Sequence, residues 1–314
     1  MSENMRAISQ DTLGGPEVLT EVQLPRPVPG PGEILVRVRA AGLNPTDWKH
    51  RANGGFLGTP PFVLGWDVSG EVAETGVGVT LFQPGDEVFG MLPYPYGHGA
   101  LAEYAVGPAR AFARKPARLD HVQAAAIPLA ALTAWQALVD TADLQAGQRV
   151  LIHAAAGGVG HFAVQIAKAR GAYVIGTASA PNHEFLRAIG VDEAIDYHTT
   201  EVAEVVRDVD VVLDSITDEN SIRSLRTLRP GGVLVTLRPM GEVDLAAEAS
   251  RLGVRALRML VEDDHAGMVA LAGLVESGEL RPTIAGTFPL ADTAKAHALG
   301  DTGRTVGKLV VTVP

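Results

Sequence analysis

The sequence contains no cysteine among its 314 residues. Disulfides, a thiol nucleophile, a zinc site with cysteine ligands and an iron–sulfur cluster are therefore excluded. Basic residues are in the minority, since 26 Lys and Arg stand against 36 Asp and Glu, and the formal net charge is -10. A surface of this charge does not neutralise the phosphates of a duplex, so nucleic acid is not an expected partner.

Long uninterrupted apolar runs are absent as well. The most apolar stretch, residues 122–139, is interrupted by Pro128 and by polar residues and is short for a bilayer span. Residues 1–6 are polar, and no apolar segment follows them, so no signal peptide is indicated. We therefore expect no membrane partner and a cytoplasmic location.

The remaining composition is that of a globular protein with many turns, since hydrophobic residues make up 46% and the chain has 35 glycines and 20 prolines. Its length favours two domains. Residues 34–40 alternate apolar and basic side chains at the period of a strand, behind a turn rich in Pro and Gly. Further short strands are expected at 68–72, 87–91 and 102–106. This pattern predicts a compact, barrel-like β domain.

Strand and helix patterns alternate in the second half, after an Ala-rich helical stretch that begins near Gln123. Strands are expected at 150–152, 173–175, 210–213 and 232–237, and helices at 159–170, 183–189, 221–228 and 267–277. Such alternation is typical of a doubly wound parallel sheet. The tail at 305–313 is strand-like again, and we expect it to rejoin the first domain.

The sharpest motif is the turn Ala-Ala-Ala-Gly-Gly-Val-Gly at residues 154–160. It stands between a predicted strand and a predicted helix, the context in which backbone N–H groups and a helix N-terminus approach a pyrophosphate. We therefore expect a dinucleotide at this turn. The residues expected to contact it are Ala156, Gly157, Gly158, Val159 and Gly160.

The end of the next strand distinguishes NADP from NAD. An NAD site places Asp or Glu there to hold the ribose 2′-hydroxyl, whereas residues 176–183 carry no acid. A small polar pocket admits a 2′-phosphate instead, with Ser179 as a donor and Asn182, His183 or Arg187 adding donors or charge. The alternative is an ordinary loop in which Ser179 caps a helix. The pattern favours NADPH.

Six segments, taken in order, resemble those of one family; they are residues 42–47, 61–70, 82–88, 128–136, the glycine turn and 307–311. Through them the chain resembles the zinc-independent quinone oxidoreductases, the zeta-crystallin-like branch of the medium-chain dehydrogenase/reductase superfamily. The resemblance implies an α/β fold with a GroES-like β-barrel domain (1–123, completed by 263–314) and a Rossmann domain (124–262). It also implies an active cleft between the two domains and a homodimer.

Zinc-dependent relatives carry Cys near position 44 and a His-Glu pair near positions 66 and 67, where this chain has Asn44, Trp66 and Asp67. No metal site is expected. The resemblance then implies hydride transfer from NADPH to a small molecule, a quinone or an α,β-unsaturated carbonyl, in which positioning does most of the catalytic work. The alternatives are a non-enzymatic NADPH-binding sensor or structural protein, and an enoyl-thioester reductase, for which the sequence shows no clear basic channel.

The resemblance also assigns catalytic roles. Asn44 lines the nicotinamide end of the site, where its amide bonds the cofactor or the substrate carbonyl; the alternative is a turn residue before Pro45. Lys49 matches enone-reductase relatives and polarises the substrate carbonyl, or is a solvated surface residue.

Further positions are assigned to the cofactor in the same way. Thr133 matches a contact of the nicotinamide, and Tyr197 matches a residue near the adenosine phosphate. Asn182 stands where the family has a phosphate-binding Lys. Lys308 and Arg304 reach the cofactor or are surface charges.

Three other features suggest structural roles. His153 and His161 flank the glycine turn, and we expect both to be satisfied locally. The acidic run 262–264 before His265 resembles a metal cluster but is better interpreted as the start of a helix, where acids suit the dipole.

Overall fold

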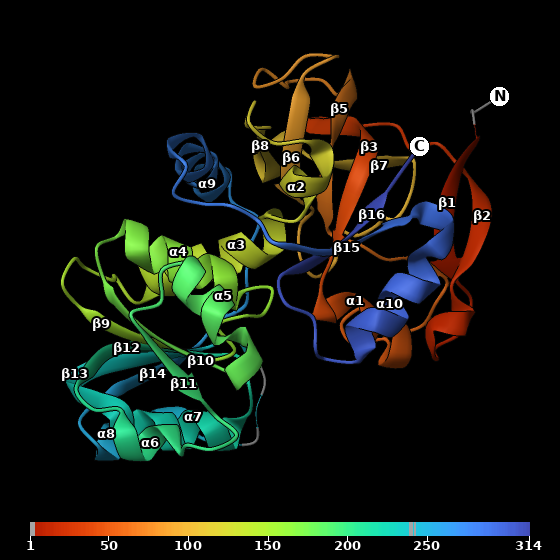
Figure 1. The fold of residues 1–314 in the computed structure, drawn as a ribbon. Coiled ribbons are helices and arrows are strands. Elements are labelled where there is room, and N and C mark those ends of the chain that lie inside the picture. The colour runs from red at the N-terminus through yellow and green to blue at the C-terminus, as the bar shows by residue number, and fades with distance from the viewer. Residues whose placement is uncertain (1–3, 239–240, 242) are drawn as a thin grey trace. The chain divides into compact units, whose positions relative to one another are not determined.

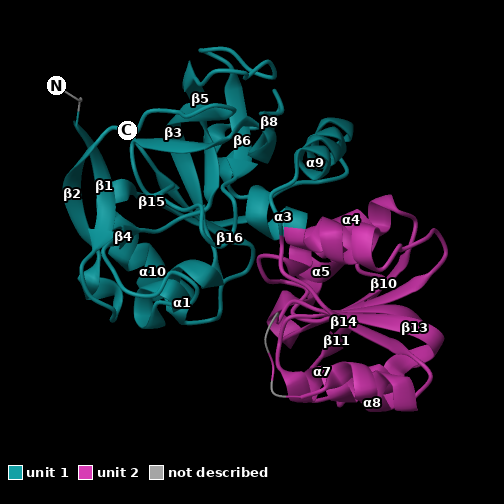
Figure 2. Ribbon diagram, turned by 180° about the vertical axis from the view of Figure 1, so that it is seen from behind, with its two compact units in different colours: residues 1–132, 262–314 teal, residues 133–261 magenta. Residues whose placement is uncertain are grey.

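The computed structural model describes residues 4–238, 241 and 243–314. The first three residues of the polar start lie outside this part. The chain divides into two compact units, one made of residues 1–132 and 262–314 and the other of residues 133–261 (Figure 2). Each unit has its own sheet structure and its own buried residues.

The first unit is built mainly on antiparallel strands. Their bounds are β1 (Asn4–Gln10), β2 (Thr20–Pro25), β3 (Glu33–Leu43), β4 (Phe62–Val63), β5 (Asp67–Thr75), β6 (Glu87–Met91), β7 (Tyr104–Pro108), β8 (Phe112–Arg114), β15 (Ile284–Pro289) and β16 (Lys308–Thr312). Seven of them form one sheet in the order β15-β16-β3-β5-β6-β8, with β7 paired to β3. The others form a sheet in the order β2-β1-β4.

Strand β3 is the centre of this unit because it pairs with three neighbours. Its alternation buries Val36, Val38 and Ala40, whereas Arg37 and Arg39 point away from the core. The C-terminal strand β16 pairs with it antiparallel, Val311 opposite Ala41. The tail thus forms a strand in the sheet of the first unit.

The helices of the first unit are α1 (Pro45–Asn53), α2 (His121–Ala125), α9 (His265–Ser277) and α10 (Thr293–Asp301), and α3 (Pro128–Trp135) extends past its boundary. Helices α1 and α10 lie side by side (Figure 1). Ala125 and Ala126 pack against Ala40 of β3 and Val310 of β16. This packing explains why the first unit continues to Leu132, past residue 123.

The second unit contains one parallel sheet in the order β11-β10-β9-β12-β13-β14. Its strands are β9 (Arg149–Ile152), β10 (Tyr173–Ala178), β11 (Glu193–Asp196), β12 (Val209–Asp214), β13 (Leu228–Thr236) and β14 (Arg255–Arg258). Counted from β9, this is the order 3-2-1-4-5-6 of a dinucleotide-binding sheet. The topological switch point lies between β9 and β12, because the chain reverses its direction across the sheet there.

Five helices cover this sheet: α4 (Gly160–Ala169), α5 (His183–Ala188), α6 (Val202–Val205), α7 (Asp218–Ser224) and α8 (Leu245–Arg251). Helices α4 and α5 lie on one face and α6, α7 and α8 on the other (Figure 1). The strands read as nearly continuous apolar runs because both faces are covered; Leu151, Ile175 and Leu234 are fully buried.

The predicted α/β fold with a doubly wound parallel sheet is confirmed. Strands β1 and β2 and helix α1 were not predicted, and the helix expected at 221–228 is α7 followed by a short 3₁₀ turn at Leu225–Thr227. Within the described residues, no helix is both long enough and apolar enough to span a membrane.

Candidate functional site

The glycine turn lies at the carboxyl end of β9, where it is tied to the neighbouring strand. The Ala155 N–H donates to the carbonyl oxygen of Thr177 (2.9 Å), and the Ala154 N–H donates to its Oγ1 (3.2 Å). Ala154 adopts a φ of 49°, in the left-handed region that few non-glycine residues enter. Such a conformation marks a backbone held in place by its surroundings.

Gly160, the first residue of α4, requires the absence of a side chain. A Cβ at this position would lie 2.2 Å from the Ala154 carbonyl oxygen and 2.7 Å from the Ala155 Cα. The helix therefore starts directly against the strand-to-turn backbone, which is the role of the third glycine in a dinucleotide fingerprint. The N–H groups of residues 161–163 donate to the carbonyl oxygens of Gly157 and Val159, so the N–H groups open to a ligand are those of the turn before them. Backbone of this shape fits a pyrophosphate.

Three residues expected near the adenosine phosphate lie along the same edge. Ala178 of β10 pairs with Asp196 of β11, so Ser179 and Tyr197 follow adjacent strand ends. The Asn182 Nδ2 donates to the Ser179 Oγ (3.2 Å). Tyr197 is 54% exposed.

Asp196 directly precedes Tyr197 in the sequence. Its Oδ1 accepts a hydrogen bond from the His198 N–H (3.0 Å). The arrangement of Ser179 and Asn182 offers neutral donors and suits a 2′-phosphate. The His183 Nε2 lies 3.3 Å from the carbonyl oxygen of Ala178, the residue before Ser179.

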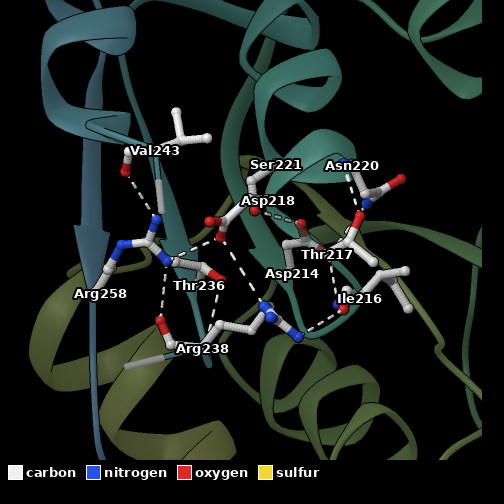
Figure 3. A network of polar contacts seen from close by, with 10 residues as sticks. All are labelled: Asp214, Ile216, Thr217, Asp218, Asn220, Ser221, Thr236, Arg238, Val243 and Arg258. Carbon is white, nitrogen blue, oxygen red and sulfur yellow. Dashed lines mark hydrogen bonds and ion pairs between the residues drawn. The ribbon is translucent and has the colours of Figure 1, made fainter. Parts of the chain in front are cut away.

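The carboxyl ends of β12, β13 and β14 carry a second polar network (Figure 3). Asp214, the last residue of β12, accepts hydrogen bonds from the Ser221 Oγ (2.6 Å) and from the Ile216 N–H (2.9 Å). These bonds connect β12 to α7. They also fix the chain at the point where a dinucleotide crosses the switch point of such a sheet.

Arg258, the last residue of β14, anchors the segment that follows β13. Its Nη1 donates to the Asp218 Oδ1 (3.0 Å) and to the Arg238 carbonyl (3.1 Å), and its Nη2 donates to the Val243 carbonyl (3.1 Å). The hydrogen bond from Arg258 lowers the pKa of Asp218. A Cβ at Gly241 would lie 2.2 Å from the Asp218 Oδ2, so Gly241 lies directly against the ion pair.

In the first unit, Asn44 belongs to a buried polar cluster with Asp67 and Lys308. The Asn44 Nδ2 donates to the Asp67 Oδ2 (2.9 Å), and its Oδ1 accepts a short hydrogen bond from the Lys308 Nζ. The Lys308 Nζ also lies 3.3 Å from the Asp67 Oδ2. Asn44 and Lys308 are each 2% exposed. The amide is thus held in one orientation, since only its oxygen can accept from the ammonium.

Two carboxyl groups of this region have shifted pKa values. Burial raises the pKa of Asp67, while Lys308 and Asn44 act in the opposite direction. Burial also raises the pKa of Asp47, from 3.8 to about 7, against the lowering effect of the hydrogen bond that it accepts from the Asn44 N–H (2.7 Å). The Asn44 amide nitrogen carries a second hydrogen beyond the one that it donates to Asp67.

The other expected residues lie in different settings. Lys49, on α1, is exposed and forms no ion pair within the described residues. Thr133 is buried in α3, in the second unit. Arg304 is exposed. Lys308 does not stand at the surface: its contacts with Asn44 and Asp67 favour a role in positioning Asn44 over direct contact with the cofactor.

Each of the features expected to be structural has local partners. The His153 Nε2 lies 2.8 Å from the Ser224 Oγ, and the His161 Nδ1 lies 2.9 Å from the Gly157 carbonyl. Asp264 caps α9 by accepting from the Ala266 and Gly267 N–H groups. No group of three or more His, Asp or Glu side chains suited to a metal ion occurs in the part of the chain that the structure describes.

The sequence did not identify Asp47 and Asp67 as members of the site. A local signal existed for Asp47, because Asn44, Pro45 and Asp47 occupy the N-cap, N1 and N3 positions of a helix start. Asp67 was noted only as a residue that replaces a zinc ligand, and no local pattern links it to Lys308.

Two family models match separate parts of the chain, the first within the first unit and the second across the boundary at residue 261 into the C-terminal part. Residues 30–117 match the alcohol dehydrogenase GroES-like domain, and residues 189–311 match the zinc-binding dehydrogenase family. The expected GroES-like domain is thereby confirmed.

Relatives match over nearly the whole chain. The mitochondrial NAD(P)H oxidoreductase RTN4IP1 of Danio rerio is 34% identical, over 90% of this chain and 84% of its own. The chloroplastic quinone-oxidoreductase QR1 of Triphysaria versicolor is 33% identical, over 98% of both chains. The 2-haloacrylate reductase of a Burkholderia species is 35% identical, over 95% of this chain and 96% of its own.

Solved structures agree with these relatives. The quinone oxidoreductase of Coxiella burnetii superposes with a TM-score of 0.93 at 37% identity, covering 99% of this chain and 100% of its own. The mycobacterial protein Rv1454c, solved in complex with NADPH, superposes with a TM-score of 0.86 at 30% identity, covering 98% and 99%.

Proposed function

The chain is an NAD(P)H-dependent oxidoreductase of the quinone oxidoreductase branch of the medium-chain dehydrogenase/reductase superfamily, and we propose that it uses NADPH to reduce a quinone or an α,β-unsaturated carbonyl compound. One observation carries the cofactor assignment. Gly160 packs closely against the backbone of the glycine turn, and this turn lies at the carboxyl edge of a sheet with the strand order of dinucleotide-binding proteins.

Preference for NADPH over NADH is supported by the end of β10. Ser179 and Asn182 offer hydroxyl and amide groups there, and residues 176–183 contain no carboxylate that would repel a 2′-phosphate. A similar protein, Rv1454c, is known in complex with NADPH.

The acceptor class is supported by the names of the relatives. One is a quinone-oxidoreductase, and another is a 2-haloacrylate reductase, whose substrate is itself an α,β-unsaturated acid. When bound, NADPH supplies a hydride. In the proposal Asn44 and Lys49 stabilise the negative charge that develops on the acceptor oxygen, and solvent gives the final proton.

The Asn44 amide suits this role because it does not have to reorganise during the reaction. Lys308 and Asp67 fix its orientation before the substrate arrives, and a preorganised donor costs no reorganisation energy at the moment of charge transfer. Thr133, Tyr197 and the turn residues 156–160 complete the proposed cofactor contacts.

The experiment is a set of initial rates of NADPH oxidation by the full-length protein, with menadione and methyl vinyl ketone as acceptors and NADH as the cofactor control. Saturable turnover of either acceptor, faster with NADPH, is the expected result. NADPH binding without turnover of any acceptor would instead indicate a sensor or structural protein. Acceptance of an enoyl thioester alone would reassign the substrate class.

The cytoplasmic location and the homodimer stay predictions. Two of the relatives carry mitochondrial and chloroplastic names. Cell fractionation and sedimentation velocity of the purified protein test these two predictions.

A further inference from the structure

A chain of hydrogen bonds connects the loop after β6 to the first turn of α1, beside Asn44. The Thr46 Oγ1 lies 2.9 Å from the Tyr94 hydroxyl and 3.0 Å from the His50 Nδ1. The His50 Nδ1 lies 2.7 Å from the Thr46 carbonyl oxygen, and the His50 Nε2 accepts from the Phe56 N–H at 3.1 Å. All four residues belong to the first unit.

The partners of His50 favour one direction for this chain, from Thr46 to Tyr94. Because the Nε2 accepts a backbone N–H, the proton of the neutral ring is on the Nδ1, which therefore donates toward Thr46. Burial lowers the pKa of His50, so the ring is neutral at physiological pH. The Thr46 hydroxyl cannot donate to a nitrogen that already carries a proton. Among its contacts in the described residues, the acceptor left for its hydrogen is the Tyr94 oxygen.

The phenol of Tyr94 consequently accepts from Thr46 and keeps its own O–H for another acceptor. Its ring is held in place by aromatic neighbours, with ring centroids 5.3 Å from Trp66, 6.3 Å from Phe56 and 6.4 Å from His50. The indole of Trp66 also donates to the carbonyl of the adjacent Pro95 (3.2 Å). Tyr94 is half-buried and Phe56 is 37% exposed, so both residues keep surface that is open to solvent.

We propose that Tyr94 is a further catalytic residue, whose hydroxyl donates a hydrogen bond to the carbonyl oxygen of a planar quinone or enone lying against Phe56. The inference rests on the proposed reduction of a carbonyl acceptor. Negative charge moves onto this oxygen as the hydride bonds to the acceptor carbon, and an oriented donor stabilises it. Tyr94 keeps its own proton throughout. Reduction adds one hydride and one solvent proton to the acceptor.

The protonation of Tyr94 agrees with this role. Burial raises the pKa of its phenol above the ordinary value of 10, so it is a neutral donor at every pH at which the enzyme would work. Thr46 is the second residue of α1 and stands two residues from Asn44, which places the phenol at the same end of this helix as the proposed amide donor.

The test compares Tyr94→Phe with Tyr96→Phe, the same change in the same loop at a ring that is 73% exposed. We expect kcat/KM for menadione or methyl vinyl ketone to fall about 10- to 100-fold in Tyr94→Phe. KM for NADPH should stay within about twofold, and Tyr96→Phe should match the wild type.

Rates for Tyr94→Phe equal to those of Tyr96→Phe overturn the inference while leaving the proposed function intact. A wild-type protein that turns over no acceptor overturns the proposed function, and this inference with it. The pair Thr46→Val and Thr46→Ser provides a test that leaves the phenol in place. Valine removes the donor that orients it and should lower kcat, whereas serine should retain the rate; equal rates for both would contradict the directed chain.

Discussion

The Lys308 ammonium lies 3.3 Å from the Asp67 carboxylate, and both side chains are buried, with exposed fractions of 2% and 0%. One residue comes from the last strand of the chain and the other from β5, and Asn44 bridges them. A buried ion pair contributes little net stability, but breaking it leaves a charge without compensation. We therefore interpret the Lys308–Asp67 pair as a means of orienting Asn44, which hydrogen-bonds to both residues.

The first prediction follows from that asymmetry. Lys308→Met and Asp67→Asn should each lower the free energy of unfolding by about 3–5 kcal/mol, because each leaves one buried charge unpaired. The double variant removes both charges and should be more stable than either single variant by about 1–3 kcal/mol. Urea denaturation of the wild type, the two single variants and the double variant measures the coupling energy between the two charges. Additive losses would show that the two groups do not compensate each other.

How much of this could be predicted from the sequence depends on whether the signal is local. The alternation of apolar and basic residues at 34–40 indicates a strand with one buried face, and this strand was predicted. The glycine turn was predicted as well, because its whole motif lies within seven consecutive residues. Helix α1 also had a local signal, in Asn44, Pro45 and Asp47, but no helix was predicted there.

The contacts around Asn44 had no such signal. Lys308 is 241 residues from Asp67 and 264 from Asn44 in the sequence, and their meeting depends on β16 pairing with β3. The link between Thr46 and Tyr94 spans 48 residues through a loop without regular periodicity. Such contacts require the fold, because a pattern along the chain carries no information on which distant side chains share a partner.

The second prediction concerns pH. Burial raises the pKa of Asp47 to about 7 in the folded protein, from an ordinary value of 3.8. Between these values the folded state holds a proton that the unfolded state has lost, so stability falls as the pH rises from about 4 to 7. Asp47→Asn removes the titration and should raise the free energy of unfolding at pH 8 by up to about 4 kcal/mol.

Urea denaturation at pH 5 and pH 8 measures this difference. The matched control is Asp11→Asn, at an exposed aspartate, which should leave the pH dependence of the wild type unchanged. An Asp47→Asn protein that loses as much stability between the two pH values as the wild type would contradict the shift.

The third prediction concerns the choice of cofactor. Asn182 donates to Ser179 and offers a neutral amide at the position where the family resemblance implies a phosphate-binding Lys. Asn182→Lys adds a cation beside the proposed 2′-phosphate and should lower KM for NADPH about three- to tenfold, since charge-assisted bonds are stronger than neutral ones. KM for NADH, which lacks this phosphate, is the internal control. A parallel fall for both cofactors would place the 2′-phosphate elsewhere.

The fourth prediction concerns Lys49. Its exposed ammonium on α1 is proposed to stabilise charge on the acceptor oxygen. Lys49→Met should lower kcat/KM for methyl vinyl ketone about tenfold and leave KM for NADPH unchanged. Lys295→Met removes an exposed ammonium that pairs only at the surface with Asp292, at 2.7 Å, and serves as the control. Equal rates in the two variants would make Lys49 a solvated surface residue.

The last prediction concerns the backbone of the turn. A Cβ added at Gly160 meets the Ala154 carbonyl at 2.2 Å, and neither atom belongs to a flexible side chain, so the turn itself must move. The displaced N–H groups can no longer converge on a pyrophosphate, because their positions depend on the close start of α4. Gly160→Ala should therefore weaken NADPH binding at least about tenfold.

The control is Gly273→Ala, in α9, where no atom lies within 4 Å of the added Cβ. This variant should bind NADPH as the wild type does and gain about 0.5–1 kcal/mol of stability. Fluorescence titration with NADPH and thermal melting of both variants separate the two effects, and an unchanged Kd in Gly160→Ala would show that the turn does not hold the cofactor.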